Sequence, residues 1–119
     1  MANILAVDDS ASMRQMVTFA LKSAGHVFTE APDGRSGLNT AKLKDFDLVI
    51  TDVNMPHMNG IELAKALRQL PNYRMVPILM LTTESDDSKK MEGKAAGVTG
   101  WIVKPFDPNK LIQVISRVL

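Results

Sequence analysis

The sequence predicts an α/β fold in which strands and helices alternate and the strands form one parallel sheet. Three nearly all-apolar runs, at residues 4–7, 48–51 and 78–81, are too short to be helices. Such runs are typical of parallel strands that are covered by helices on both faces. Segments with helical periodicity lie between these runs, so the order of elements is strand then helix, repeated along the chain.

Two further strands complete the predicted sheet. Residues 26–30 alternate polar with apolar, as a half-exposed edge strand does, and the short apolar run at residues 101–103 fits the opposite edge. Since crossovers between parallel strands are right-handed, we expect a (βα)5 doubly wound sheet with strand order 2-1-3-4-5, the flavodoxin-like arrangement. In such sheets ligands bind beyond the carboxyl ends of the strands, where the strand order reverses.

The helices between the strands differ in the strength of their apolar pattern. The first helix has six apolar residues at helical spacing: Met13, Met16, Val17, Ala20, Leu21 and Ala24. Gly25 follows them and is expected to end the helix. The pattern returns at residues 61–67 and at residues 111–118, where Asp107 and Pro108 open the last helix. Residues 33–43 and 86–96 are expected to form helices with few large apolar side chains.

Composition limits the classes of protein that the chain can belong to. Its 119 residues suit a single domain, 1–119, with no second domain. A net charge of +1 argues against a nucleic-acid partner, and the absence of cysteine excludes disulfides and thiolate chemistry. The chain has neither a signal peptide nor an apolar run of about 18 residues. We therefore expect a cytoplasmic, monomeric protein that does not insert into membranes.

Polar residues follow four of the predicted strands at the point where each strand ends. They are Asp8, Asp9, Asp52, Thr82, Thr83 and Lys104. Each has an ordinary explanation, because Asp and Thr cap helices and turns and a Lys there usually points to water. Together, however, they bring three carboxylates to one edge of the sheet, where joint ionisation is unfavourable unless a cation is present. Mg²⁺ suits such a site because it prefers oxygen ligands and needs few from the protein.

This set of side chains suits phosphoryl transfer. A divalent ion and Lys104 would neutralise the oxygens of a phosphoryl group, and Thr82 would donate a hydrogen bond to it. The sequence contains no glycine-rich phosphate loop. Asp52 lies between the other groups, and a carboxylate nucleophile that forms an aspartyl phosphate is an established chemistry.

The stretches VDDSASMR, TDVNMPHMNG, MLTTE and WIVKPF resemble, in this order, the receiver domains of two-component response regulators. The resemblance covers essentially the whole chain and is to the single-domain, chemotaxis (CheY-like) type. It implies that Asp52 accepts a phosphoryl group from a sensor histidine kinase. It also implies that Asp8, Asp9, Asp52 and the main-chain carbonyl of Asn54 hold Mg²⁺, and that Lys104 pairs with the phosphoryl oxygens.

The resemblance further implies a switch and a set of modulators. Thr82 would couple the phosphorylation site to Trp101, in a family where that aromatic residue is usually Tyr and often Phe. The peptide bond between Lys104 and Pro105 would be cis. Self-dephosphorylation would be modulated at three positions: Asn54, Thr83 and Glu84. Thr83 is bulkier than the Ala or Gly often found there, so we expect slower access of phosphodonors and water.

The resemblance implies that the chain is a phosphoacceptor that catalyses its own phosphorylation and dephosphorylation. It is therefore not expected to be an enzyme that turns over a separate substrate. Its partners would include a histidine kinase and, further downstream, a flagellar motor switch protein or a phosphatase. The expected partner surface is formed by the fourth helix, the fifth strand and the last helix. The broad apolar surface of the last helix, with Ile112, Val114 and Leu119, fits this role but also fits a deeply buried helix.

Other functions remain open from the residues alone. A haloacid-dehalogenase-like small phosphatase also uses an Asp nucleophile with Mg²⁺, Thr and Lys. It needs a second carboxylate two residues after the nucleophile, where this chain has Asn54, and a nucleophile on the first strand. A flavodoxin-like nucleotide carrier would need a phosphate-binding motif that the chain lacks. A receiver that serves as a phosphate sink, or in a pathway other than motility, fits the same residues.

Overall fold

The computed structural model describes residues 2–83 and 87–119, the second range with side chains from residue 90 onward. Strands and helices alternate along the chain as β1 (Asn3–Val7), α1 (Ala11–Ser23), β2 (Val27–Ala31), α2 (Gly34–Leu43), β3 (Leu48–Asp52), α3 (Gly60–Arg68), η1 (Pro71–Tyr73), β4 (Ile78–Thr82), α4 (Asp87–Ala95), β5 (Gly100–Val103) and α5 (Pro108–Val118). In this part of the chain, every helix is too short or too polar to cross a bilayer.

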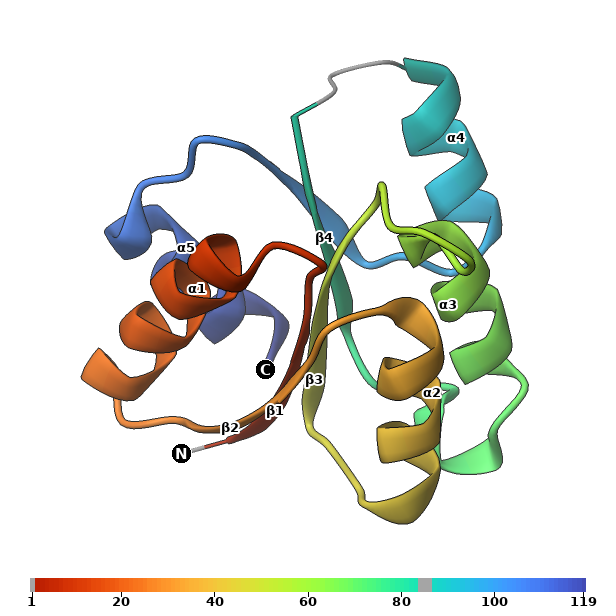
Figure 1. Ribbon diagram of the computed structural model, residues 1–119, viewed down its shortest axis with the longest axis horizontal. Coiled ribbons are helices and arrows are strands. Elements are labelled where there is room, and N and C mark those ends of the chain that lie inside the picture. The colour runs from red at the N-terminus through yellow and green to blue at the C-terminus, as the bar shows by residue number, and fades with distance from the viewer. Residues whose placement is uncertain (1, 84–86) are drawn as a thin grey trace.

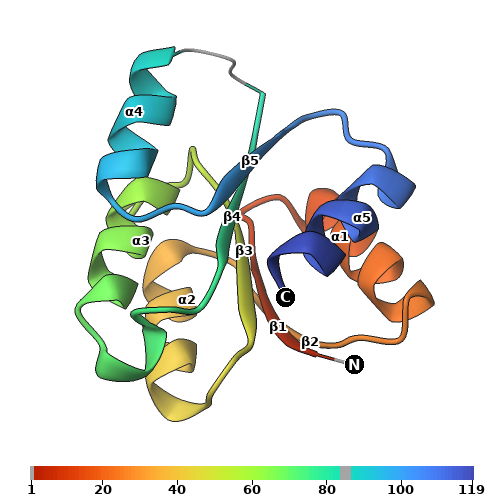
Figure 2. The same ribbon diagram turned by 180° about the vertical axis from the view of Figure 1, so that it is seen from behind.

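The five strands form one parallel sheet in the order β2-β1-β3-β4-β5, which confirms the predicted topology. Helices α1 and α5 cover one face of the sheet, and α2, α3 and α4 cover the other (Figures 1 and 2). The order reverses between β1 and β3, because α1 and α2 leave the sheet toward opposite faces. The carboxyl ends of these two central strands therefore border the crevice in which such folds bind ligands.

Two apolar cores lie on either side of the sheet. Because successive side chains of a strand point to opposite faces, Leu5 belongs to the core under α2 and α3, while Ile4 belongs to the core under α1 and α5. Every residue of β3 and β4 is buried. Asp52 and Thr82, the last residues of β3 and β4, are therefore buried together with the strands that carry them.

Small differences from the predicted elements have local causes. Strand β2 begins one residue later than expected, because the His26 amide bonds the Leu21 carbonyl and pairing with β1 starts at Val27. Met16 was expected on the inner face of α1 but is 49% exposed. Consecutive residues of a helix point in directions about 100° apart, so Met16 lies at the edge of the apolar face while Val17, the next residue, is buried.

The entry to α3 brings backbone close to the end of β3. Asn59 caps the helix by accepting from the Glu62 amide at 2.8 Å, and the Glu62 carboxylate accepts from the Asn59 amide at 3.0 Å. The Gly60 amide bonds the Val53 carbonyl at 2.8 Å. A Cβ at Gly60 would collide with the main-chain carbonyl of Asp52. Glycine is therefore needed here for the loop after β3 to fold back beside Asp52.

The last helix is opened by Asp107, whose side chain accepts from the Asn109 amide, with Pro108 in the first turn. Leu111 and Ile115 are fully buried against the sheet. The other apolar residues of the helix are partly buried, and Leu119 is exposed. The helix is thus anchored by a narrow stripe and leaves apolar surface at its flanks.

Candidate functional site

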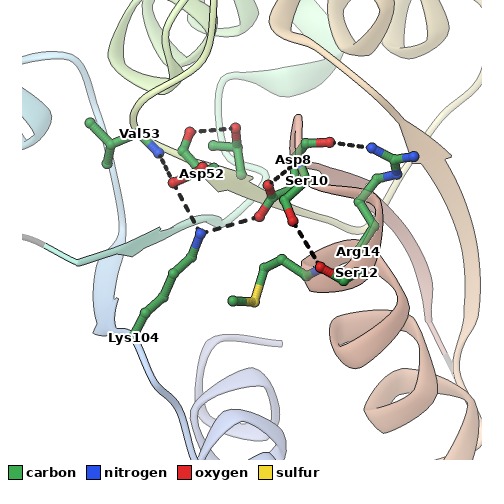
Figure 3. A network of polar contacts seen from close by, with 9 residues as sticks. Asp8, Ser10, Ser12, Arg14, Asp52, Val53 and Lys104 are labelled. Atoms are coloured by element: carbon green, nitrogen blue, oxygen red, sulfur yellow. Dashed lines mark hydrogen bonds and ion pairs between the residues drawn. The ribbon is translucent and has the colours of Figure 1, made fainter.

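An ion-paired triad lies at the carboxyl ends of β1, β3 and β5 (Figure 3). The Lys104 ammonium lies 3.3 Å from Asp8 Oδ2 and 3.3 Å from Asp52 Oδ1. Asp8 is 3% exposed and Asp52 is 8% exposed, so both carboxylates are largely removed from water. The lysine therefore reaches inward across the edge of the sheet and pairs with both acids.

Asp9 joins the two buried acids in an acidic cluster. One carboxylate oxygen from each of Asp8, Asp9 and Asp52 lies within 4.8 Å of the others. Asp9 is exposed, whereas Asp8 and Asp52 are buried, so one side of the cluster is open to water. A set of hard oxygen donors that is partly open to solvent fits Mg²⁺, which takes few protein ligands and keeps several waters.

The pKa of Asp52 is raised above the usual value for an aspartate. The main cause is burial, which disfavours the charged form, and repulsion by Asp8 adds to it. The Lys104 ammonium and the Val53 amide act in the opposite direction. Asp52 is thus a buried acid whose charge is only partly balanced within the protein, and a bound cation would relieve the imbalance.

Local hydrogen bonds orient each acid. The Val53 amide donates to Asp52 Oδ1 at 2.8 Å, and the Ser10 amide donates to Asp8 Oδ1 at 2.9 Å. Ser10 also caps α1, since its side-chain oxygen accepts from the Met13 amide at 3.2 Å. The two carboxylates therefore keep their orientation without depending on Lys104 alone.

Arg14 is a member of this network that the sequence analysis missed. Its Nη1 donates to the main-chain oxygen of Asp8 at 2.6 Å (Figure 3). Its Nε lies 3.4 Å from Glu30 Oε1. The side chain thus ties the turn that carries Asp8 and Asp9 to the end of β2. An arginine one turn into the helix after an acidic pair is the only sequence signal, and it does not reveal this contact.

The backbone around Lys104 turns sharply after β5. The Lys104 amide bonds the Thr82 carbonyl at 2.7 Å, so pairing between β4 and β5 continues to the lysine. The peptide bond between Lys104 and Pro105 is cis, the conformation expected from the sequence. Phe106 then enters the core under α1 and α5.

Thr82 and Trp101 lie on the same face of the sheet. Trp101 pairs with Met80 across the strands, and Thr82 lies two residues further along β4, so all three side chains point the same way. Thr82 is fully buried, whereas Trp101 is half-buried and packs against the core under α3. A Cβ at Gly93 of α4 would collide with the indole ring. The indole thus lies inward, in a space that exists because position 93 has no side chain.

The expected modulators are not all part of the triad. Asn54 and Thr83 are both exposed at the edge of the site, in the segments that follow β3 and β4. Glu84 lies outside the described residues. His26 and His57, which offered no ligand spacing in the sequence, take no part in the acidic cluster.

Two buried acids joined by an inward lysine at the switch point of a doubly wound sheet fit the receiver class of signalling domain that the sequence resembles. The family model for the response regulator receiver domain matches residues 4–116. The chain is also 41% identical over 116 residues to the chemotaxis protein CheY-3 of Vibrio cholerae, covering 97% of this chain and 89% of that protein. The chain therefore belongs to the response regulator receiver domain family, whose members are signalling proteins and not classical enzymes.

Solved structures agree with this assignment. The structure of the chemotaxis response regulator CheY4 of Vibrio cholerae superposes with a TM-score of 0.95 at 54% identity, covering 100% of this chain and 99% of that one. The receiver domain of the sensor histidine kinase PA1611 of Pseudomonas aeruginosa has a TM-score of 0.91 at 26% identity, covering 98% and 95%. That structure carries a magnesium ion coordinated in its active-site cleft. The whole-chain match does not favour the phosphatase alternative.

Proposed function

We propose that Asp52 accepts a phosphoryl group from a phosphohistidine of a sensor histidine kinase, and that this event changes how the protein binds its next partner. The observation that carries this proposal is the position of Lys104, 3.3 Å from a carboxylate oxygen of both Asp8 and Asp52. An ammonium held between two buried acids is well placed to pair with the oxygens of a phosphoryl group on either one.

The chemistry follows from the orientation of Asp52. Its Oδ1 accepts from the Val53 amide and faces Lys104, which fixes the plane of the carboxylate. A bond forms between a carboxylate oxygen and phosphorus, while the phosphorus–nitrogen bond to the donor imidazole breaks and the nitrogen keeps the electron pair. Lys104 balances the charge on the phosphoryl oxygens, and the buried hydroxyl of Thr82 donates to one of them.

The residues of the acidic cluster fit a magnesium ion. Asp8, Asp9, Asp52 and the main-chain carbonyl of Asn54 would hold it, and bound Mg²⁺ supplies positive charge that offsets the negative charge of the acids and the phosphoryl group. Lys104 alone neutralises one of the three carboxylates, which is the physical reason that a divalent cation is needed. The same side chains would serve self-catalysed phosphorylation and, with an attacking water, self-catalysed dephosphorylation.

Exposed residues beside the acidic cluster would set the lifetime of the phosphoryl group. Asn54 lies two residues after Asp52, Thr83 directly follows β4, and both are exposed. Glu84, the third expected modulator, lies outside the described residues. Replacing Thr83 with Ala should speed both phosphorylation by a small donor and hydrolysis of the product. Equal rates in the two proteins would show that Thr83 does not hinder access.

We assign the signal read-out to the surface formed by α4, β5 and α5. The inward Trp101 and the buried Thr82 lie on the strands that connect the site to this surface, so a shift of Thr82 toward a phosphoryl group changes the space around the indole. Phosphorylation would then favour one of two pre-existing arrangements of the surface. The resemblance to chemotaxis proteins points to a flagellar motor switch protein or a phosphatase as the partner, while a phosphate sink or a non-motility pathway remains the second candidate.

A small phosphodonor provides the test. The protein is incubated with acetyl phosphate and MgCl₂ and its intact mass is measured. The expected result is the gain of one base-labile phosphoryl group, which disappears in Asp52→Asn, in Lys104→Ala and when EDTA is added. Asp47→Asn, which removes an exposed carboxylate next to the other end of β3, is the matched control and should be phosphorylated normally. An unchanged mass in the wild-type protein would refute the proposal.

Amide hydrogen exchange tests the read-out separately. Phosphorylated protein should differ from unphosphorylated protein in the protection of residues 87–119, and the difference should be absent from β1 and β2. Identical protection across α4, β5 and α5 would refute a read-out through this surface while leaving the phosphoacceptor role intact.

A further inference from the structure

Arg68, the last residue of α3, is a part-buried cation that lies outside the acidic cluster and binds three main-chain carbonyls. Its Nε and Nη2 both donate to the Gly97 carbonyl, at 3.1 and 2.7 Å. Its Nη1 donates to the carbonyls of Tyr73 and Val76, at 2.5 and 2.6 Å. Burial lowers the pKa of this guanidinium, and the four hydrogen bonds compensate for its lost hydration. Arg68 therefore connects the end of α3 both to the turn after α4 and to the segment before β4.

The Gly97 carbonyl belongs to the turn that ends α4, the helix beside α3 (Figures 1 and 2). Gly97 has a φ of +92°, the left-handed conformation that ends many helices and favours glycine. The Val98 amide bonds the Gly93 carbonyl at 2.9 Å. The Gly97 amide bonds the Lys94 carbonyl at 3.1 Å, which completes a Schellman motif. The end of α4 is thus closed by its own backbone and held against α3 by Arg68.

The body of α4 (Asp87–Ala95) is held less firmly than its end. Among residues 90–95, whose side chains the structure describes, only Gly93 is buried, and Met91 is 72% exposed. Gly93 packs directly over the Trp101 indole. A helix of nine residues with a glycine inside it has little stability of its own and depends on packing. The described attachment of α4 is therefore strongest at its C-terminal end, with Trp101 beneath Gly93.

This arrangement makes α4 a lever. Each residue of an α-helix advances by about 1.5 Å, so Gly93 lies about 6 Å from Gly97 along the helix, and Asp87 lies about 15 Å from it. If the end at Gly97 is fixed, a displacement of the helix at Gly93 becomes about 2.5 times larger at Asp87. A movement of the Trp101 indole against Gly93 is therefore amplified toward the first turn of α4.

We propose that Arg68 is a positioning residue for signal transmission: it fixes the C-terminal end of α4, and α4 tilts about this end when Trp101 changes its position. The anchor at Gly97 does not depend on phosphorylation. The tilt deepens the proposed read-out through α4, β5 and α5, and rests on that proposed function. It specifies that the first turn of α4, and not its C-terminal end, is the part of the helix that moves most.

The anchor is tested by amide hydrogen exchange in the unphosphorylated protein. Arg68→Lys keeps the charge but offers one donor nitrogen in place of three, so it cannot bind Gly97, Tyr73 and Val76 in the same way. We expect exchange at residues 96–98 to become about tenfold faster, a larger change than that of the slowest amides of β3 and β4. Arg74→Lys makes the same substitution at an exposed arginine nearby and should leave exchange at residues 96–98 unchanged.

Two exchange results would overturn the anchor. In the first, Arg68→Lys leaves exchange at residues 96–98 as slow as in the wild type. In the second, exchange there accelerates no more than in β3 and β4, as a general loss of stability would produce. Circular dichroism checks that each variant is folded.

The tilt is tested by distances between pairs of nitroxide labels, measured by pulsed electron paramagnetic resonance. The chain contains no cysteine, so labels attach only at introduced cysteines. Lys65→Cys on α3 is paired with Met91→Cys or with Lys94→Cys on α4, all at exposed positions. Met91 lies about twice as far from Gly97 as Lys94 does. Phosphorylation by acetyl phosphate should therefore change the first distance about twice as much as the second, and Arg68→Lys should make the two changes similar.

The outcomes separate the tilt from the proposed function. Equal changes of the two distances with Arg68 in place, or a ratio that Arg68→Lys leaves unaltered, would overturn the tilt. Arg74→Lys should keep the wild-type ratio. Intact mass shows whether each sample carries a phosphoryl group. An unchanged mass would refute the phosphoacceptor role and the tilt with it, whereas the exchange experiment on unphosphorylated protein decides independently whether Arg68 anchors α4.

Discussion

Replacing Asp52 with Asn should stabilise the protein at neutral pH when no divalent cation is present. The wild-type protein buries this carboxylate next to Asp8, and its raised pKa means that folding disfavours the charged form. Asn has nearly the same shape and can still accept from the Val53 amide. Lys104 stays paired with Asp8 in the variant. The substitution therefore removes the negative charge of Asp52 without leaving the Lys104 ammonium unpaired.

The magnitude follows from the distances at the site. With an effective dielectric constant of about 20, Lys104 at 3.3 Å attracts Asp52 by about 5 kcal/mol, and Asp8 within 4.8 Å repels it by about 3.5 kcal/mol. Asp9 is exposed, and solvent reduces its repulsion to about 1 kcal/mol. The charges therefore nearly cancel, and the desolvation of Asp52 decides the sign. Replacing a buried charge of this kind by a neutral side chain of similar shape is often neutral or stabilising by about 1–4 kcal/mol, and we expect a gain near the lower end of that range for the variant.

The assay is urea and thermal unfolding in EDTA, followed by circular dichroism at pH 7 and at lower pH. For a chain of this length, 1 kcal/mol corresponds to about 4 °C in Tm. In the unfolded state an aspartate has a pKa of about 3.9, whereas in the folded state that of Asp52 is higher. Between the two values the folded protein binds the additional proton, so wild-type stability rises as the pH falls. The advantage of Asp52→Asn should accordingly vanish near pH 4.

Magnesium should reverse the order of stability. At a hundredfold excess over Kd, a ligand that binds only the folded protein adds about 2.7 kcal/mol, and we expect only the wild type to gain it. The control Asp47→Asn should change stability by less than about 0.5 kcal/mol under all conditions, because the Asn side chain can still accept from the exposed Asn3 amide that Asp47 binds at 2.8 Å. Two results in EDTA would refute the electrostatic account of the site. In the first, Asp52→Asn is no more stable than wild type at pH 7. In the second, its stability advantage over wild type is the same at pH 4 as at pH 7.

Other predictions concern residues around the site and the core. Arg14→Ala removes the bond to the Asp8 carbonyl and should weaken Mg²⁺ binding about tenfold, measured by calorimetry, with a much smaller effect on unfolding in EDTA; unchanged affinity would mean that Arg14 does not position the acidic turn. Gly93→Ala should force the Trp101 indole outward, seen as a red-shifted emission spectrum and higher quenching by acrylamide; an unshifted spectrum would contradict this. Tyr73→Phe leaves the Phe46 amide without its acceptor and should cost about 1–3 kcal/mol in urea unfolding, and no loss would show that water replaces the hydroxyl.

Much of the fold and the composition of the site could be predicted from the sequence. The all-apolar runs of β1, β3 and β4 identify buried parallel strands, because burial on both faces removes the polar alternation. The strand order follows from handedness and from the polarity of the edge strands. Since parallel strands end at the same rim, the residues directly after them, such as Asp8, Asp52 and Lys104, could be assigned to one site before any distance was known.

Tertiary structure alone decided which of these groups touch and what surrounds them. That Lys104 bridges Asp8 and Asp52, and that Arg14 ties down the acidic turn, depends on register and side-chain rotamers. The space for the Trp101 indole depends on how α4 packs on the sheet. Local sequence patterns report which face of an element is buried. They do not report the distance between side chains that are far apart in the chain, because that distance is set by packing.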